Sequence, residues 1–354
     1  MNETVKTIAL KRGPSLGGHW SELTSKYSIY LILLALIVVS SFLNPAFFSE
    51  KNFSNVSRQI SITTILAFGQ TLLIICGMID LAQGSVLALA GLLSVIFYKM
   101  TGEIVSALLV GVLVGVLCNL VSGLIVIRFN TPPFIATLAM QTAARGAALL
   151  LTAGQNVYQL GNFVVWGKGV ILGIPTPVIF LIAVTVFSWY LLNHWRLGRY
   201  IYAVGGNEEA SRASGIKVKK TKLLAFAVNG VFVGLAGVLY MSRVNAGLPN
   251  AGVGFEFDAM TAAIIGGTSF SGGVGTAIGT LAGAFIMGFL GNIMNLLGIQ
   301  SYVQQIIKGA IIVVAVASDI ASKKKKRKAT LGETQEKKPA GQKSPDQITT
   351  NKPN

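Results

Sequence analysis

Three ionisable side chains, Asp80, Arg145 and Lys308, lie inside or beside strongly apolar runs of this sequence. A charged group in such surroundings is costly, so it either marks a path for ions or substrate or is held by a partner. Asp80 and Gln83 also have the spacing of a capping box at the start of the next apolar run, so Asp80 has a structural alternative to substrate or gating contact. Arg145 is either functional or paired with helix-end carbonyls or with Asp80.

The sequence contains no comparable signature of enzyme chemistry. It has no G-x-x-x-x-G-K-[ST] phosphate-binding loop and no evident set of nucleophile, base and orienting residue. The two histidines, His19 and His194, are too far apart for metal-ligand spacing. Cys76 and Cys118 fall inside apolar runs, which is typical of buried, inert thiols. We therefore predict a protein without catalytic residues, a metal site or a cofactor of its own.

The composition is that of an all-α integral membrane protein. Hydrophobic residues make up 52% of the 354 residues and charged residues 12%, against roughly 25% charged residues in soluble domains. The 40 glycines indicate closely packed helices. The net charge of +16 gathers at the ends of apolar runs and in the tail, as the positive-inside rule describes, so we do not expect nucleic-acid binding.

Charge and hydropathy divide the chain into three parts. Residues 1–27 are a polar, cytoplasmic N-terminal segment, residues 28–320 form the membrane domain, and residues 321–354 form a basic tail that opens with KKKKRK. The tail cannot bury a core, so we expect it to be disordered, cytoplasmic and in contact with acidic lipid. About ten spans place both termini in the cytoplasm. Residues 153–175 form an ordered outer loop, either a landing surface for an external partner or a lid on the helix ends.

Two glycine-rich breaks interrupt the apolar runs. The first contains Gly77, Asp80, Gln83 and Gly84, and the second begins at Gly266 and Gly267 and reaches Gly273. Gly77 to Gly84 and Gly266 to Gly273 have the same spacing, which suggests an internal structural repeat. Because broken helices at corresponding places often line a transport path, we predict that the two breaks, with Arg145, form the path or its gate.

A basic polar stretch, residues 196–222, separates two apolar runs and contains a short predicted helix from about 208 to 214. Asn207 can cap its start, Glu208 and Glu209 suit its first turn, and Gly215 can end it. Its remaining residues are mostly small, so the helix could enter a groove on another protein while a cation reaches an acidic rim; they are Ala210, Ser211, Arg212, Ala213 and Ser214. The alternative is a solvated cytoplasmic loop without a partner.

Three segments in the same order resemble one family, the ribose-type permeases that form the membrane subunits of bacterial ATP-binding-cassette sugar importers. The segments are GMIDLAQGS at 77–85, TPPFIATLAMQTAARG at 131–146 and GGNEEASRASGI at 205–216. Met78, Ala82 and Ser211 depart from the family's usual Gly, Ser and Ala. The resemblance covers roughly residues 50 to 320.

The resemblance implies a monosaccharide permease that works with a second permease subunit, either an identical copy or a paralogue. It also implies two ATPase subunits on the coupling loops, which bind the ATP, and an external sugar-binding protein. Related permeases import branched-chain amino acids or nucleosides, and these substrates stay open as an alternative. A less favoured alternative is a secondary transporter that uses Asp80, Arg145 or Lys308 for ion coupling.

Overall fold

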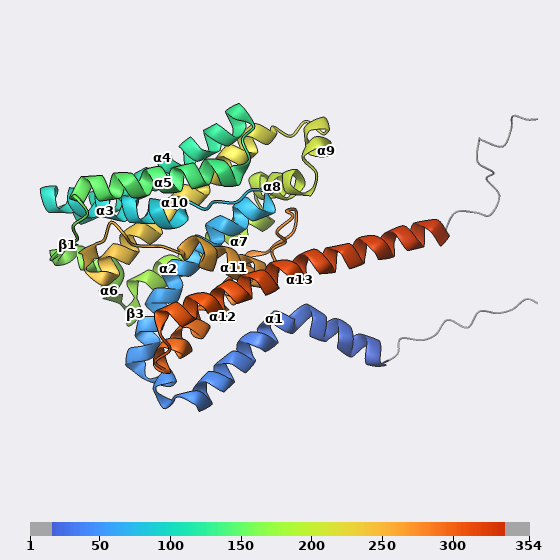
Figure 1. Ribbon diagram of the computed structural model, residues 1–354, viewed down its shortest axis with the longest axis horizontal. Helices are drawn as coiled ribbons and strands as arrows, with labels where there is room; N and C mark the ends of the chain where they lie inside the picture. The colour runs from blue at the N-terminus through green and yellow to red at the C-terminus, as the bar shows by residue number, and fades with distance from the viewer. Residues whose placement is uncertain (1–15, 337–354) are drawn as a thin grey trace, which may run out of the picture.

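The computed structural model describes residues 16–336 of the chain, with side chains described for residues 28–321. The described part is almost entirely helical, with four very short strands (Figure 1). Its elements are α1 (Leu16–Leu43), η1 (Pro45–Phe48), α2 (Glu50–Ile75), α3 (Gln83–Thr101), α4 (Ile104–Phe129), α5 (Pro133–Thr152), β1 (Val157–Tyr158), η2 (Gly161–Val164), α6 (Val165–Lys168), β2 (Val170–Ile171), β3 (Ile174–Pro175), α7 (Thr176–Asn193), α8 (Arg196–Gly206), α9 (Glu208–Ala213), α10 (Val218–Val244), β4 (Ala246–Gly247), α11 (Phe255–Ile265), α12 (Ala277–Leu296) and α13 (Ser301–Glu336).

Eight of these helices are long and apolar enough to cross a membrane. They are α2, α3, α4, α5, α7, α10, α12 and the first 21 residues of α13. The apolar part of α1, Ser28–Leu43, is shorter, and α11 has only 11 residues, about half of the roughly 20 that a span needs. The predicted all-α membrane fold is confirmed, and two of the ten predicted spans correspond to these shorter segments.

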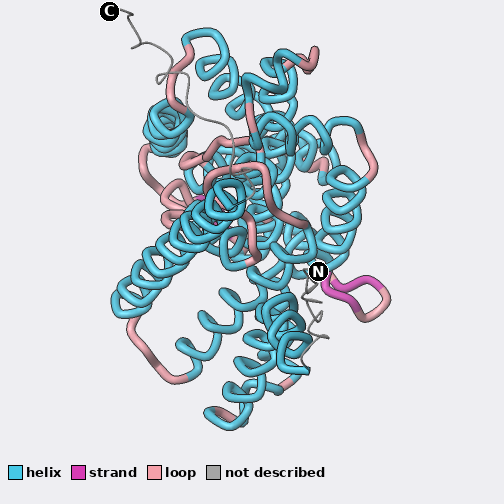
Figure 2. The backbone as a smooth tube through the Cα atoms, turned by 90° about the vertical axis from the view of Figure 1, so that its right-hand side faces the viewer, coloured by secondary structure: helices cyan, strands magenta, loops and turns pink. Residues whose placement is uncertain are grey.

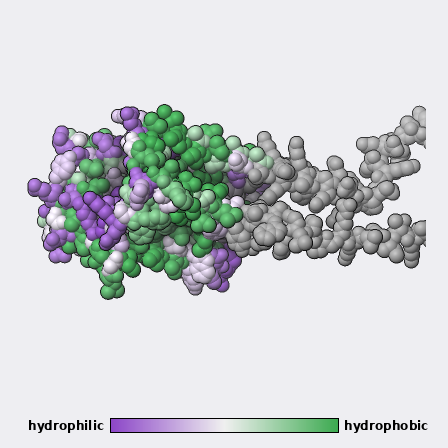
Figure 3. Space-filling model, turned by 90° about the horizontal axis from the view of Figure 1, so that it is seen from below, coloured by the Kyte–Doolittle hydropathy of each residue, from purple (hydrophilic) through white to green (hydrophobic). Residues whose placement is uncertain are grey.

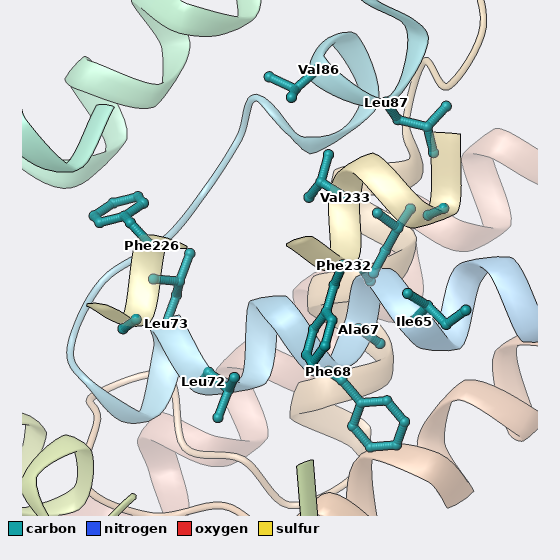
Figure 4. Close-up of a cluster of buried hydrophobic side chains, with 14 of the residues drawn as sticks. Ile65, Ala67, Phe68, Leu72, Leu73, Val86, Leu87, Phe226, Phe232 and Val233 are labelled. Atoms are coloured by element: carbon teal, nitrogen blue, oxygen red, sulfur yellow. The ribbon is translucent and has the colours of Figure 1, made fainter. Parts of the chain in front are cut away.

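Helix α2 lies at the centre of the bundle, because 83% of its candidate span is buried, more than in any other described helix. Apolar side chains of α2, α3 and α10 pack together around it (Figure 4). They include Ile65, Phe68, Leu72, Leu87, Phe226 and Val233. The surface in turn is broadly apolar, and hydrophilic residues gather toward the left end in Figure 3. A bundle with an apolar core and an apolar surface is what lipid solvation requires.

The tightest helix crossing joins α4 to α10. A Cβ atom built on Gly115 would overlap the carbonyl oxygen of Gly230, and one built on Gly230 would lie 2.6 Å from the carbonyl oxygen of Gly115. Gly111 and Gly234 repeat this close approach one turn away. Small residues let two membrane helices come into backbone contact, so the sequence's glycine spacing is used for packing here.

The two ends of the bundle carry different structures (Figure 1). One end, called the strand end below, carries β1, α6, β2 and β3, and the other carries α8 and α9. Strand β1 pairs antiparallel with β4, with Val157 opposite Gly247, and β2 pairs with β3. Residues 153–175 are therefore ordered, as predicted, while their side of the membrane stays a prediction.

Helix α13 differs from the sequence prediction at its C-terminal end. It runs without interruption to Glu336, past the predicted start of a disordered tail at residue 321. The run of Lys and Arg that suggested disorder is continuous with an apolar helix, and Lys and Arg are good helix formers. Residues 337–354 and residues 1–15, which belong to the predicted tail and N-terminal segment, lie outside the described residues.

Candidate functional site

The first break begins where α2 ends at a left-handed glycine. Gly77 has φ +78°, and the peptide N–H groups of Gly77 and Met78 donate to the carbonyls of Ile74 (2.9 Å) and Leu73 (2.8 Å). This pair of hydrogen bonds is the Schellman motif, in which glycine avoids the Cβ penalty of a positive φ. The chain is thereby turned away from the axis of α2 before α3 begins.

The second break has the same geometry. Gly267 has φ +84°, and the N–H groups of Gly267 and Thr268 donate to the carbonyls of Ile264 (2.9 Å) and Ala263 (3.0 Å). Gly77 therefore corresponds to Gly267, one residue later than the predicted match with Gly266. The predicted register was wrong because Gly266 is still right-handed, with φ −64°, at the end of α11. The shared cap is nevertheless the kind of similarity that an internal repeat would produce.

A buried polar network surrounds Asp80. One carboxylate oxygen accepts the N–H of Ala82 at 2.8 Å, and the other accepts the side-chain amide of Asn229 at 2.7 Å. The amide of Asn229 also donates to Asn119 Oδ1 at 2.7 Å, and its own Oδ1 accepts from Gln83 Nε2 at 2.8 Å. The four polar side chains of this network, Asp80, Gln83, Asn119 and Asn229, are each at most 2% exposed. The network ties the first break to α4 and α10.

The predicted capping box of Asp80 and Gln83 is wrong. Helix α3 has Ala82 at its N-cap, and no side chain accepts a hydrogen bond there. The N-cap lies two residues later than Asp80, because an Asp80 carboxylate oxygen instead accepts the Ala82 N–H in a local turn. Gln83, the first helical residue, points to α2 and α10, where its amide donates to the Leu66 carbonyl (3.2 Å) and to Asn229.

Gly84 permits close contact between the start of α3 and the segment that precedes α11. A Cβ atom on Gly84 would overlap the carbonyl oxygen of Gly252 and would lie 2.5 Å from Glu256 Oε2. Glu256 is 2% exposed, its Oε1 is 3.4 Å from Gln141 Nε2, and its Oε2 has no hydrogen-bond partner in the described part of the chain. A larger residue at position 84 would separate these two segments.

Arg145 lies inside α5 and is held by backbone carbonyls. Its guanidinium donates to the carbonyl of Pro249 (2.5 Å) and to that of Ala251 (2.8 Å), in the loop that leads into α11. It makes no hydrogen bond with Asp80, so of the two predicted partners only main-chain carbonyls are found. Arg145 therefore holds the loop that leads into α11 against α5, and Gly84 lets the same loop approach the start of α3.

The caps predicted for the short helix α9 are confirmed. The Ala210 N–H donates to Asn207 Oδ1 at 2.9 Å, and the helix, whose last residue is Ala213, is followed by the left-handed Gly215 with φ +82°. The N–H of Ile216 donates to the carbonyl of Ser211 (3.0 Å), and that of Gly215 donates to the carbonyl of Arg212 (3.1 Å). A helix this short is marginal by itself, and these bonds fix both of its ends.

One face of α9 is covered by the chain itself and the other is free. Ser211 is 5% exposed, so the prediction that it belongs to the outward docking surface is wrong. Residues Glu209, Ala210, Arg212, Ala213, Ser214 and Gly215 are exposed. An outward face of small residues therefore remains, and its contact with a partner stays a prediction.

Glu208 anchors α9 to α10. Its carboxylate accepts from Lys222 Nζ at 2.7 Å and from Arg212 at 3.0 Å. The hydrogen bond from Lys222 is the main cause that holds the pKa of Glu208 below its ordinary value. Arg212 is thus paired with Glu208 of its own helix. The sequence had instead indicated that this cation reaches outward to a partner.

Helix α8 connects α9 to both breaks, which the sequence did not reveal. A Cβ atom on Gly205 would overlap the Ile75 carbonyl oxygen at the end of α2, and that oxygen accepts the N–H of Gly273 at 2.8 Å. The Tyr202 hydroxyl donates to the carbonyl of Gly275 at 2.6 Å. Helix α8, the end of α2 and the second break therefore meet at one place.

Several residues of this site escaped the sequence analysis. Asn119 and Asn229 are single amides in apolar runs, a signal that attention to ionisable groups alone passed over. Tyr202 and Gly205 belong to an amphipathic stretch that gave no sign of its distant partners. Among the described residues, no group of three or more His, Cys, Asp or Glu side chains could hold a metal ion.

Residues 52–316 match the family model described as "Branched-chain amino acid transport system / permease component". The chain is 42% identical over 295 residues to a ribose import permease protein of Haemophilus influenzae, covering 82% of this chain and 91% of that relative. It is 37% identical to a D-allose transport system permease protein of Escherichia coli, covering 83% and 91%, and 33% identical to a xylose transport system permease protein of Haemophilus influenzae, covering 84% and 97%. No solved structure matches the chain.

Proposed function

Because the chain belongs to the family of permease components that its residues 52–316 match, we propose that it is the membrane subunit of an ATP-binding-cassette importer for a monosaccharide. The sugar class rests on the relatives, which are named for ribose, D-allose and xylose and are matched over more than nine-tenths of their lengths. Branched-chain amino acids and nucleosides are not favoured, because the three relatives named above are permeases for ribose, D-allose and xylose. The protein is a multi-pass protein of the bacterial inner membrane.

The contact of α8 with both breaks is the structural observation that carries the mechanism. ATPase subunits that press on the exposed face of α9 would move α8, since Asn207 joins the two helices directly. Gly205 would pass that movement to the end of α2, and Tyr202 would pass it to the second break. The breaks would then exchange an outward-open for an inward-open arrangement. The chain itself hydrolyses nothing, and ATP is bound by the partner.

A secondary transporter would need an ionisable group that can take up and release an ion. The three charges that the sequence offered for ion coupling are already engaged. Asp80 binds Asn229, Arg145 binds two carbonyls, and Lys308 Nζ lies 2.7 Å from Asp258 Oδ2. This arrangement favours a permease driven by a partner over one driven by an ion gradient.

Reconstitution tests the proposal. The chain in proteoliposomes, with its ATPase and its external binding protein, should take up a pentose or hexose only when ATP is present. Ala210→Arg should abolish uptake, and the ATPase should no longer co-purify with the chain. The reason is that a long cation would be forced into the proposed contact between α9 and the ATPase. Ala210→Ser, which keeps the residue small, is the matched control and should behave as wild type. Uptake driven by an ion gradient without the ATPase would contradict the proposal.

A further inference from the structure

The β2–β3 hairpin, residues 169–176, is a projection made of apolar residues. Val170 pairs with Pro175 and Ile171 with Ile174, and the Thr176 N–H closes the base by donating to the Gly169 carbonyl at 2.9 Å. Leu172, at the tip, is 97% exposed, and Val170, Ile171 and Ile174 are 42% to 56% exposed. A row of four exposed aliphatic side chains on one hairpin is unfavourable in water.

The tip also has an unfavourable backbone. Leu172 has φ +52° and Gly173 has φ +79°, as in the two-residue turns that favour Asn and Gly at both central positions. A leucine is disfavoured in the left-handed region, because its Cβ lies too close to the following carbonyl oxygen. Nothing in the described part of the chain covers Leu172, so the contacts that favour a leucine here lie outside the molecule.

The position of the hairpin limits what can cover it. The hairpin lies at the strand end, at the opposite end of α7 from α8 (Figure 1). It stands out from the side of the bundle, as the magenta ribbon in Figure 2 shows. Its base is fixed, because Arg58 donates to the Lys168 carbonyl at 3.2 Å and the Trp166 indole donates to the Ile104 carbonyl at 3.3 Å. A segment that extends sideways from membrane helices, level with their ends, meets the boundary of the bilayer.

A shallow groove adjoins the hairpin. It has a volume of about 500 Å³, and its lining, here called the α6 groove, consists of Ile104, Asn162, Val164, Val165, Lys168 and Gly169. Three of these six residues carry aliphatic side chains, while Lys168 is exposed and forms no ion pair with any described residue. An aliphatic groove beside one free ammonium group matches an acyl chain beside a phosphate.

We propose that the hairpin and the α6 groove bind phospholipid at the membrane boundary of the strand end. Leu172 and its neighbours insert among the upper parts of the acyl chains, and Lys168 binds the lipid phosphate. A second membrane subunit is disfavoured as the occupant, because helix contacts in membranes favour small residues, whereas this surface is bulky. Helix α7, which follows the hairpin directly, also carries exposed aliphatic side chains, with Ile182 53% and Val186 58% exposed.

The insertion of the hairpin into lipid is tested by the depth of residue 172 in the bilayer. In a chain lacking Cys76 and Cys118, Leu172→Cys carries an environment-sensitive fluorophore, and the chain is placed in nanodiscs of phosphatidylcholine and phosphatidylglycerol. The emission should shift to the blue and should be quenched several-fold more by lipids brominated near the headgroup than by unbrominated lipids. Gln155→Cys, at an exposed position of the same end, is the matched control and should stay in water. An aqueous spectrum at position 172, or a blue shift seen only after an external protein is added, would overturn the proposal.

The lipid phosphate contact is tested separately. Lys168→Gln should lower the amount of phosphatidylglycerol that co-purifies with the chain, measured by native mass spectrometry, by at least twofold. Lys99→Gln is the matched control, because the Lys99 ammonium already donates to the Tyr158 carbonyl at 2.8 Å. Equal loss in both variants, or no loss in Lys168→Gln, would overturn the phosphate contact. Neither readout requires transport, so both hold even if the sugar assignment fails.

Discussion

The two breaks share one cap and differ in what holds them. The first is bound by side chains to the core of the bundle, through Asp80, Asn119 and Asn229. The second is bound mainly at its backbone, by Ile75, by the Tyr202 hydroxyl and by Asp319, which accepts from the Phe270 N–H at 3.1 Å. Buried side-chain networks rigidify a site, whereas contacts to loop carbonyls can be exchanged at smaller cost. We infer that the first break is the fixed part of the gate and that the second is the part that moves with α8.

Among the substitutions that test this difference between the breaks, Gly205→Val should have the largest effect on transport. The added side chain would overlap the Ile75 carbonyl and would separate α8 from both breaks. Transport should fall to background while the protein still reaches the membrane, and ATP hydrolysis by the complex should lose its dependence on substrate. Uptake and ATPase assays on the purified complex measure both.

Gly206→Ala is the matched control, because a Cβ atom at Gly206 meets nothing within 4 Å. It should transport as wild type. If Gly205→Val also transports normally, α8 does not act on the breaks.

Asn229→Ala should destabilise the folded protein at the first break. It removes the partner of one Asp80 carboxylate oxygen and of Asn119 Oδ1, and one of the two acceptors of Gln83 Nε2. One unsatisfied buried group costs roughly 1–3 kcal/mol. We expect a lower melting temperature in detergent and less protein in the membrane, with near-normal transport per remaining molecule. If Asn229→Ala has normal stability but hydrolyses ATP without transporting sugar, the first break would instead be the moving part.

Tyr202→Phe should produce a smaller change that is confined to the second break. It removes one hydrogen bond, to the Gly275 carbonyl, worth about 1 kcal/mol. The melting temperature should hardly change, while the ratio of sugar transported to ATP hydrolysed should fall. An unchanged ratio would show that this bond does not transmit movement.

Glu208 should give the smallest effect, and it depends on pH. Its folded-state pKa is lowered, chiefly by the hydrogen bond from Lys222, so its stabilising contact is fully present above the ordinary carboxyl pKa of roughly 4.3. The contact is lost as the pH falls through the lowered value. Because the side chain is 40% exposed, solvent screening keeps the effect small.

A spin label on Ala213→Cys reports the motion of α9. Its mobility should rise as the pH is taken from 6 toward 3, and the Glu208→Gln variant should be mobile across the whole range. A wild-type label whose mobility does not change with pH would exclude the contribution of this ion pair.

Local features of the site could be predicted from the sequence and distant ones could not. The caps at Asn207 and Gly215 depend only on residues three or four positions away, so the residue types in this stretch were sufficient to predict them. The partner of Asp80 is 149 positions away, and that of Tyr202 is 73 positions away. Periodicity and turn chemistry contain no information on such pairs, because they depend on how the helices are arranged in three dimensions.

Errors of one or two residues had local causes. The capping box failed because Asp80 can satisfy either a helix start or its own backbone two residues on, and the sequence does not say which. The register of the repeat failed because Gly266 and Gly267 are both glycines, and only one is left-handed. Ser211 was placed on the outward face because a helix of six residues shows too little periodicity to fix its buried side.

The crossing of α4 and α10 has a consequence for biosynthesis. Gly115 and Gly230, which meet there, are 115 residues apart in the chain. A ribosome adds roughly 5–20 residues per second, so α4 enters the bilayer on the order of ten seconds before its partner exists. During that interval its glycine face is open to any other helix that small residues attract. Correct assembly thus depends on α4 not forming this glycine contact with another helix before α10 has been synthesised.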